Sequence, residues 1–328
     1  MSDSNHIRLG PTRLPVPAVM GILNVTPDSF SDGGRFDKPE VAVRQAAEMA
    51  EAGAAIIDVG GESTRPGAAA VTEQQELDRV IPVIESLREV TDLPVSIDTS
   101  KPRVMRESVA AGAAMINDVF ALQMEGALAA AVDLRVPVCL MHMQGTPQSM
   151  QEDPHYDDVV AEVAEFLEQR VSACADAGID EKLIVIDPGF GFGKTHAHNV
   201  ELLANLRQLR VRDRPVLVGV SRKSLLGALT GRGIRDRLPA SVAAAVVACM
   251  HGAQIIRAHD VQATVDALKV VQAVNNLGTE KCAEYILARR VFEAGSAMSR
   301  CLPISRFGWR ARPRRSWFRP AVPSGSGR

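Results

Sequence analysis

The chain has 328 residues, of which 46% are hydrophobic and 23% charged, with a formal net charge of −2. This length and composition suit a folded protein with a large core and argue against wholesale disorder. No apolar run approaches the roughly 18 to 20 residues that a membrane span requires, which excludes an integral membrane protein. The start, MSDSNHIRLG, lacks the basic and apolar regions of a secretory signal, so we expect a cytoplasmic protein.

Eight short apolar runs rich in Val and Ile predict eight strands. They start at Ala18, Ala54, Leu93, Ala113, Val136, Lys182, Pro215 and Gln254. Their continuous apolar character is typical of strands covered on both faces, as in a parallel sheet. The segments between them have helical periodicity, with helix start signals at Thr72 and at Pro39 and Pro102. We predict an α/β protein, a (β/α)8 TIM barrel with eight parallel strands, and keep a doubly wound open sheet as the alternative.

The five cysteines, at 139, 174, 249, 282 and 301, are far apart and nowhere in C-x-x-C spacing. This pattern indicates neither a disulfide framework nor a thiolate zinc site, so we expect reduced thiols.

The small net charge averages two unlike segments. Residues 1–278 hold 26 Lys and Arg against 36 Asp and Glu, a net charge of −10, whereas residues 279–328 hold 11 against 3, a net charge of +8. The basic segment is also dense in Pro, Gly and Ser, a composition that cannot readily bury a core. We predict a folded domain over 1–278 and a largely disordered basic C-terminal extension over 279–328, with a short helix at 280–294.

Polar residues gather where the predicted strands end, which in such barrels is the face that carries the active site. They are Asn24, Asp58, Glu62, Asp98, Asn117, Asp118, His142, Asp187, Ser221, Lys223, Arg257 and His259. A single Asp at such a place is more often a helix cap or a loop hydrogen bond. Eight strand ends with polar residues together predict a binding site at this face.

The carboxylate and amide groups of Asp98, Asn117 and Asp187 can bind the donor-rich edge of a guanine-like or pterin-like heterocycle. A magnesium site built from the same oxygens is the alternative, which we disfavour because the third and sixth strands lie across the barrel from one another.

Five basic residues fall around the same predicted mouth: Arg65, Arg222, Lys223, Arg257 and His259. Arg side chains match phosphate or carboxylate oxygens, so an anionic substrate is expected beside the heterocycle. Surface solvation is the alternative for each cation alone. It fits Arg257 and His259 least, because they end an apolar strand.

Two glycine-rich loops stand out, at 21–34 and 187–194. The second ends in Gly-Lys-Thr like a phosphate-binding P-loop, but Pro188 replaces the first required glycine, so we set nucleotide binding aside. The first has the composition of a mobile lid, and a poorly ordered surface loop is its simpler interpretation.

Seven motifs in order over residues 17–262 closely resemble those of the dihydropteroate synthases of the pterin-binding family. They are GILNVTPDSFSDGG, DVGGESTRPGA, SIDTSKP, INDV, IDPGFGFGKT, GVSRKS and IIRAHDV. The resemblance implies a (β/α)8 barrel that transfers 6-hydroxymethyl-7,8-dihydropterin from its diphosphate to p-aminobenzoate. The products are 7,8-dihydropteroate and diphosphate, in the biosynthesis of folate. It further implies a magnesium cofactor, a homodimer and a target of sulfonamides.

By position, the resemblance assigns roles to individual residues. Pterin binding is implied for Asp98, Asn117, Asp187 and Lys223, and diphosphate binding for Thr64, Arg257 and His259. Binding of p-aminobenzoate is implied for Arg65, Pro66, Phe192 and Ser221, and Mg²⁺ binding for Asn24. We expect Lys223, Asp98 and Arg257 to be the catalytic residues, and the loops at 21–36 and 62–70 to close over the site.

Three alternatives remain. The first is a pterin-dependent methyltransferase, which would be expected to lack the ESTRPG and SRK elements. The second is a catalytically silent pterin-binding homologue, which would be expected to lack a residue of the first loop or of the SRK or RAH elements. These elements and residues are all present in the sequence. The basic extension, with Trp309 and Trp317, suggests nucleic-acid binding, which the net charge of −10 of residues 1–278 opposes.

For the homodimer, residues 238–251 and 260–277 could supply the packing face.

Overall fold

The computed structural model describes residues 6–26, 38–64, 70–209 and 211–275 of the chain. The boundary predicted at residue 278, the extension 279–328 and its helix at 280–294 lie outside these residues. So does most of the predicted first lid, which spans 21–36, and part of the second, which spans 62–70.

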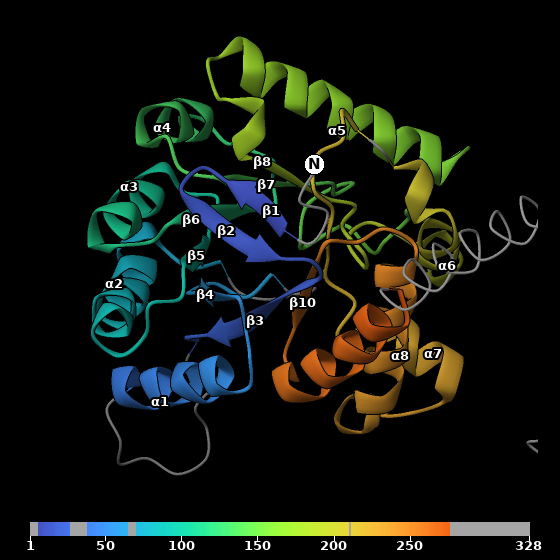
Figure 1. Ribbon diagram of the computed structural model, residues 1–328. Helices are drawn as coiled ribbons and strands as arrows, with labels where there is room; N and C mark the ends of the chain where they lie inside the picture. Colours follow the sequence, from blue (N-terminus) through green and yellow to red (C-terminus); the bar gives the residue numbers. More distant parts are fainter. Residues whose placement is uncertain (1–5, 27–37, 65–69, 210, 276–328) are drawn as a thin grey trace, which may run out of the picture. The chain divides into compact units, whose positions relative to one another are not determined.

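Eight parallel strands form the centre of the described residues, and each falls in one of the eight apolar runs (Figure 1). They are β3 (Ala18–Asn24), β4 (Ile56–Gly60), β5 (Val95–Asp98), β6 (Met115–Asp118), β7 (Val138–Met141), β8 (Ile184–Asp187), β9 (Leu217–Val218) and β10 (Ile255–Ala258). Neighbouring strands pair in the order β8-β7-β6-β5-β4-β3-β10-β9, and a parallel bridge from Ile186 to Val216 joins the two ends. The predicted barrel is confirmed, and the open doubly wound sheet is wrong.

Helices surround this barrel, one after almost every strand (Figure 1). They are α1 (Lys38–Glu51), α2 (Glu73–Val90), α3 (Pro102–Ala111), α4 (Ala127–Leu134), α5 (Val159–Asp176), α6 (His196–Ala204), α7 (Ser224–Thr230) and α8 (Leu238–Met250), followed by helical residues 261–275. The predicted capping box at α2 is confirmed, since Thr72 Oγ1 accepts from the Gln75 backbone while Gln75 Oε1 accepts from the Thr72 backbone. In the described part of the chain no helix has both the length and the apolar character needed to cross a membrane.

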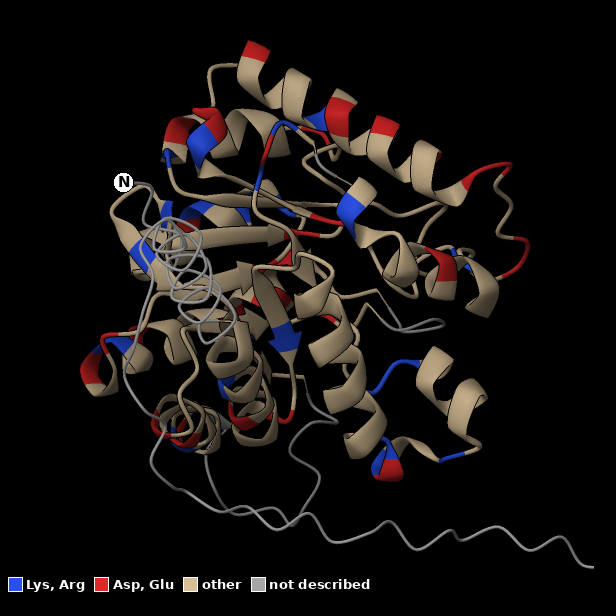
Figure 2. Ribbon diagram, turned by 45° about the vertical axis from the view of Figure 1, so that its right-hand side comes forward, with Lys and Arg blue, Asp and Glu red and all other residues tan. Residues whose placement is uncertain are grey.

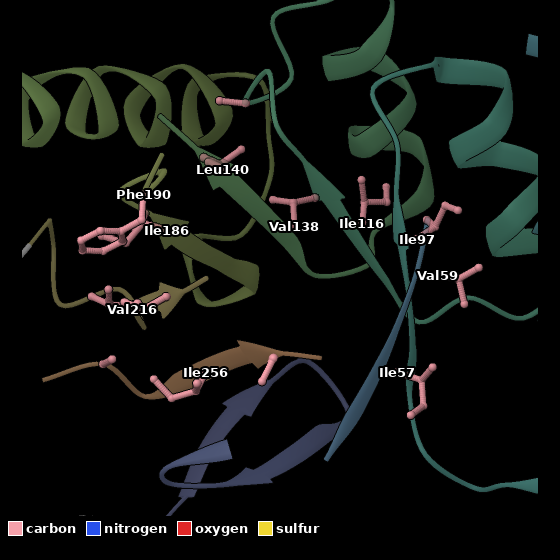
Figure 3. Close-up of a cluster of buried hydrophobic side chains, with 14 of the residues drawn as sticks. Ile57, Val59, Ile97, Ile116, Val138, Leu140, Ile186, Phe190, Val216 and Ile256 are labelled. Atoms are coloured by element: carbon pink, nitrogen blue, oxygen red, sulfur yellow. The ribbon is translucent and has the colours of Figure 1, made fainter. Parts of the chain in front are cut away.

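The strands have two different faces, as the two-residue period of a strand requires. On one face, Ile57, Val59, Ile97 and Ile116 pack against the surrounding helices and form the main core (Figure 3). The other face points into the barrel, where large apolar side chains fill the lower layer: Met20, Ile56, Met115, Cys139, Val185, Leu217 and Ile255. Towards the carboxyl ends of the strands, this inner face becomes polar.

A two-stranded antiparallel hairpin precedes the barrel and was not predicted from the sequence. It consists of β1 (His6–Leu9) and β2 (Thr12–Pro15). Leu9 and Leu14 are buried against the lower layer of the barrel interior, at 1% and 2% exposure. The hairpin therefore closes the barrel at the amino ends of its strands and leaves the opposite end for a site.

Candidate active site

The inner face of the barrel brings the predicted polar residues together at one end. Along β4 the inward side chains are Ile56 and then Asp58, and the register pairs Asp58 with Ser96 on β5. One step further along, Asp98 is paired with Asn117 on β6. Charged residues are accordingly found both on the outer helices and at the strand ends inside the ring of helices (Figure 2).

Arg257, on β10, joins these strands through a buried ion-pair network. Its Nε donates to Asp58 Oδ2 at 2.6 Å and its Nη2 donates to Asp98 Oδ2 at 2.8 Å. Asn117 Nδ2 donates to the same Asp58 oxygen at 3.1 Å. One guanidinium thus fixes carboxylates on two adjacent strands, and Asp58 is completely buried beneath it.

The pKa values of Asp98 and Arg257 are both raised in this network, for different reasons. Burial raises the pKa of the Asp98 carboxyl to about 7, with a contribution from Asp58, although Arg257 opposes the shift. Burial by itself would lower the pKa of Arg257, but Asp58 and Asp98 raise it above its usual value. Arg257 therefore stays charged, while Asp98 changes its charge near neutral pH.

Asp187, at the end of β8, faces the same space and is 5% exposed. Its Oδ1 accepts a hydrogen bond from the Gly189 backbone at 2.8 Å. Burial raises the pKa of this carboxyl, and the Gly189 hydrogen bond, Lys223 and Arg257 counteract the shift. Asp187 thus offers a hydrogen-bond acceptor close to two cations.

Lys223 and Phe192 meet at the rim. The Lys223 ammonium lies 4.1 Å from the centre of the Phe192 ring, which is within the range of a cation–π contact. Lys223 stands at the start of α7, and Phe192 belongs to the glycine-rich loop after β8. The predicted pterin-binding lysine and the predicted p-aminobenzoate-binding phenylalanine are therefore neighbours.

Ser221 and His259 form a second contact between adjacent strand ends. Ser221 Oγ accepts from the His259 backbone N–H at 3.2 Å and lies 3.0 Å from His259 Nδ1. His259 follows Arg257 by two residues, so both side chains leave β10 towards the same face. Ser221 therefore fixes the His259 imidazole at the strand end that also carries Arg257.

Asn24 ends β3 and faces Gly60 of β4 in register. A Cβ built on Gly60 would lie 3.6 Å from Asn24 Oδ1 and 3.8 Å from Asp98 Oδ2, so both oxygens lie beside this glycine. Thr64 is described and partly exposed, whereas Arg65 and Pro66 lie outside the described residues.

Two residues of the sequence prediction are directed elsewhere. The Arg222 guanidinium forms an ion pair with Asp260 through contacts of 2.5 and 3.0 Å, so it does not join the cations at the mouth. Asp118, the last residue of β6, accepts from Ser100 and from the backbone of Phe120 and Leu122, and so fixes a loop outside the barrel.

Asp58 is a residue of the site that was predicted to lie at a strand end but was given no role there. In the structure it is the residue that Arg257 and Asn117 share. Among the described residues, its Oδ1 atom has no hydrogen-bond partner, which is unusual for a buried carboxylate oxygen. Asp58 pairs in register with Ser96, two residues before Asp98 on β5, and this place one layer below Asp98 could have identified Asp58 as a site residue.

Comparison with known proteins agrees with this geometry. The pterin binding enzyme family matches residues 20–259. The dihydropteroate synthase of Escherichia coli K12 is 54% identical over 257 residues, which is 78% of this chain and 91% of the relative. Among solved structures, Xanthomonas albilineans dihydropteroate synthase with 4-aminobenzoic acid superimposes with a TM-score of 0.78 at 56% identity, covering 83% of this chain and 98% of the other. The same enzyme with 7,8-dihydropteroate gives a TM-score of 0.76 at 53% identity, covering 82% and 98%.

The fold and the polar mouth, together with these matches, define a pterin-binding barrel enzyme. Within that class, the chain belongs to the dihydropteroate synthases, the transferases that make dihydropteroate in folate biosynthesis.

Proposed function

We propose that this chain condenses 6-hydroxymethyl-7,8-dihydropterin diphosphate with p-aminobenzoate at the mouth of the barrel, giving 7,8-dihydropteroate and diphosphate. The observation that carries the assignment to these residues is the convergence of Asp98, Asn117 and Asp187 with Arg257 and Lys223. Hydrogen-bond acceptors for a heterocycle and cations for an anion thus share one end of one barrel.

The pterin ring binds deepest in this proposal. Asp187 and Asp98 accept hydrogen bonds from its N–H groups, and Asn117 can both donate and accept. Asp187 is almost completely buried, which excludes water from competing for the same donors. Lys223, which contributes to the charge balance of Asp187, donates to the ring carbonyl.

The diphosphate lies over Arg257 and His259, with Thr64 at its edge. Arg257 is already charged and fixed by two carboxylates, so it need not reorganise when negative charge develops on the leaving group. The imidazole of His259, held by Ser221, is a second donor for the phosphate oxygens.

Magnesium is the proposed cofactor, with Asn24 as its protein ligand. The donor chemistry fits, since Mg²⁺ prefers oxygen ligands and usually takes one or two from protein and the rest from phosphates and water. The amide oxygen of Asn24 lies near the Asp98 carboxylate beside Gly60. When bound, the ion would neutralise charge on the diphosphate.

The p-aminobenzoate binds at the rim beside Phe192 and Ser221 in this proposal, and Arg65 and Pro66, which lie outside the described residues, are its further expected contacts. The Phe192 ring supplies an apolar face, and Arg65 supplies a cation for the carboxylate.

The reaction requires positioning and charge stabilisation more than covalent help. The bond between the pterin methylene carbon and the diphosphate oxygen breaks, and its electron pair leaves with the diphosphate. Electron release from the dihydropterin ring supports the methylene cation, which Asp98 in its ionised form stabilises. The amine nitrogen then bonds to this carbon and loses a proton. In this dissociative path, a small amount of water-trapped pterin should accompany the product.

We also propose that the chain acts as a cytoplasmic homodimer. Exposed apolar side chains lie on α7, on α8 and along residues 261–275, among them Leu229, Met250, Val270 and Val274 at 56 to 65% exposure. Scattered apolar residues are normal on a monomer, but a group on consecutive helices favours contact with a second copy.

One assay tests the reaction. Purified protein is incubated with Mg²⁺, the pterin diphosphate and p-aminobenzoate, and dihydropteroate is followed chromatographically, with chelator and a sulfonamide as separate controls. Product that depends on Mg²⁺ and falls with the sulfonamide supports the proposal. Pterin binding by calorimetry without product would instead identify a silent homologue.

A further inference from the structure

Lys194, the lysine of the Gly-Lys-Thr motif, does not face a phosphate site. Its side chain is 2% exposed and lies beneath the glycine-rich loop that follows β8. Nζ is 2.8 Å from His142 Nδ1, 3.0 Å from the Phe192 carbonyl oxygen, 3.1 Å from that of Gly189 and 3.5 Å from that of His142. The three shortest contacts match the three protons of an ammonium group.

His142 is the acceptor that completes this cluster. When Lys194 is protonated, His142 Nδ1 must be unprotonated, because an ammonium has no lone pair to offer. Burial lowers the pKa of the imidazole to about 3, and Lys194 adds to this shift. The ring also packs edge-on against Phe166, with centroids 4.9 Å apart. Burial also lowers the pKa of Lys194, to about 7, so below that pH, where Lys194 is charged, His142 is a neutral imidazole with its proton on Nε2.

The loop itself is shaped to lie closely over the end of β7. Gly189, Gly191 and Gly193 have φ angles of +70°, +79° and +58°. A Cβ on Gly189 would overlap the carbonyl oxygen of His142, and one on Gly193 would overlap that of Gln144. The backbone can approach this closely only without side chains at these positions.

Two residues assigned to the substrates depend on this loop. The Gly189 backbone N–H donates to Asp187, and the Phe192 ring lies under the Lys223 ammonium. Other side chains also hold the loop, since Tyr156 donates to the Gly193 carbonyl at 2.8 Å and Asn199 accepts from the Gly191 backbone at 2.7 Å. Lys194, however, binds the carbonyl of Phe192 itself.

We propose that Lys194, held by His142, is a positioning residue for the second substrate: it fixes the backbone of Phe192 so that the ring forms the p-aminobenzoate side of the site. The inference rests on the proposed assignment of Phe192 to p-aminobenzoate. It gives the buried lysine a role in substrate recognition rather than in chemistry.

The test is steady-state kinetics of Lys194→Met, which keeps the length of the side chain and removes its three donors. The matched control is Lys182→Met, an exposed lysine at the opposite end of β8. We expect the KM for p-aminobenzoate to rise about tenfold in Lys194→Met, while the KM for the pterin diphosphate changes less than about threefold. Wild-type KM values, or equal rises in both, would overturn the inference.

Lys194→Gln provides a second variant, since its amide can still donate to two carbonyls. It should recover part of the loss in affinity for p-aminobenzoate, and no recovery relative to Lys194→Met would count against the donor role.

A third measurement uses the unaltered protein. The ¹⁵N NMR signals of His142, assigned with His142→Asn, should show an unprotonated Nδ1 at pH 6, and a protonated Nδ1 would contradict the proposed contact. Absence of turnover in the wild type and in Lys182→Met would refute the proposed function instead, because the inference concerns only the difference between these proteins and Lys194→Met.

Discussion

The Nε atom of Arg257 lies 2.6 Å from Oδ2 of Asp58, a buried ion pair between residues 199 positions apart in the chain. Asp58 orients the cation that is proposed to receive the departing diphosphate. It also accepts from Asn117, so one carboxylate aligns residues on two other strands.

Replacing Asp58 by Asn is expected to lower kcat/KM for the pterin diphosphate about 10- to 100-fold and to lower the melting temperature. Removal of the Asp58 charge leaves buried Arg257 paired with Asp98 alone, which weakens a buried ion-pair network. The control is Asp133→Asn, an exposed partner of Arg106. Kinetics close to the wild type in Asp58→Asn would show that Arg257 needs no such support.

The raised pKa of Asp98 predicts how stability depends on pH. The pKa of this carboxyl is near its usual value of 3.8 in the unfolded chain and about 7 in the folded protein. Between these values the folded protein binds the extra proton, so this residue makes stability fall as the pH rises from about 4 to about 7. The difference in melting temperature between wild type and Asp98→Asn, measured over that range, should show the slope. A flat difference would place the folded pKa near its ordinary value.

Lys223→Ala is predicted to reduce dihydropteroate formation about 100-fold or more while the fold is retained. The side chain contributes to the charge balance of Asp187 and covers the Phe192 ring, so its loss affects both substrates. Lys269→Ala, at an exposed position, serves as the control. Circular dichroism checks the fold, and wild-type turnover in Lys223→Ala would overturn the assignment.

Gly189→Ala should unfold the β8 loop or abolish activity, because its Cβ would meet the carbonyl of His142. Gly178→Ala is a matched control, since Gly178 also has a positive φ, +102°, but no heavy atom within 4 Å of the built Cβ. Gly178→Ala should lower the free energy of unfolding by about 1–3 kcal/mol, through backbone strain alone. Equal loss of stability in chemical denaturation would indicate that strain, and not contact with β7, explains the glycine.

The proposed dimer predicts that Val270→Glu combined with Val274→Glu sediments as a monomer. Both side chains are more than 60% exposed in the single chain, so charges there disturb only an interface. Val200→Glu on α6, at 44% exposure, should sediment as the wild type does. An unchanged sedimentation coefficient in the double variant would exclude this face.

The strands could be predicted because each is a short apolar run between helical segments, and the barrel because eight such runs alternate with helices. The β1–β2 hairpin could not, since its buried residues Leu9 and Leu14, with Ile7 packed beside them, lie outside the eight apolar runs. The places of the candidate site residues could be predicted, because they end the apolar runs that form the strands. The orientation of Arg222 could not, because its backbone adopts φ of +58° and directs the side chain to Asp260, 38 positions away.

The β1–β2 hairpin also determines by which end of the barrel substrates enter and products leave. With Leu9 and Leu14 sealing one end, both substrates and both products must pass through the same opening. In the proposed arrangement, the pterin binds against Asp98 and Asn117 and p-aminobenzoate binds nearer the rim, beside Phe192, so bound p-aminobenzoate would block exchange of the pterin. This arrangement predicts an ordered reaction, in which the pterin diphosphate binds before p-aminobenzoate.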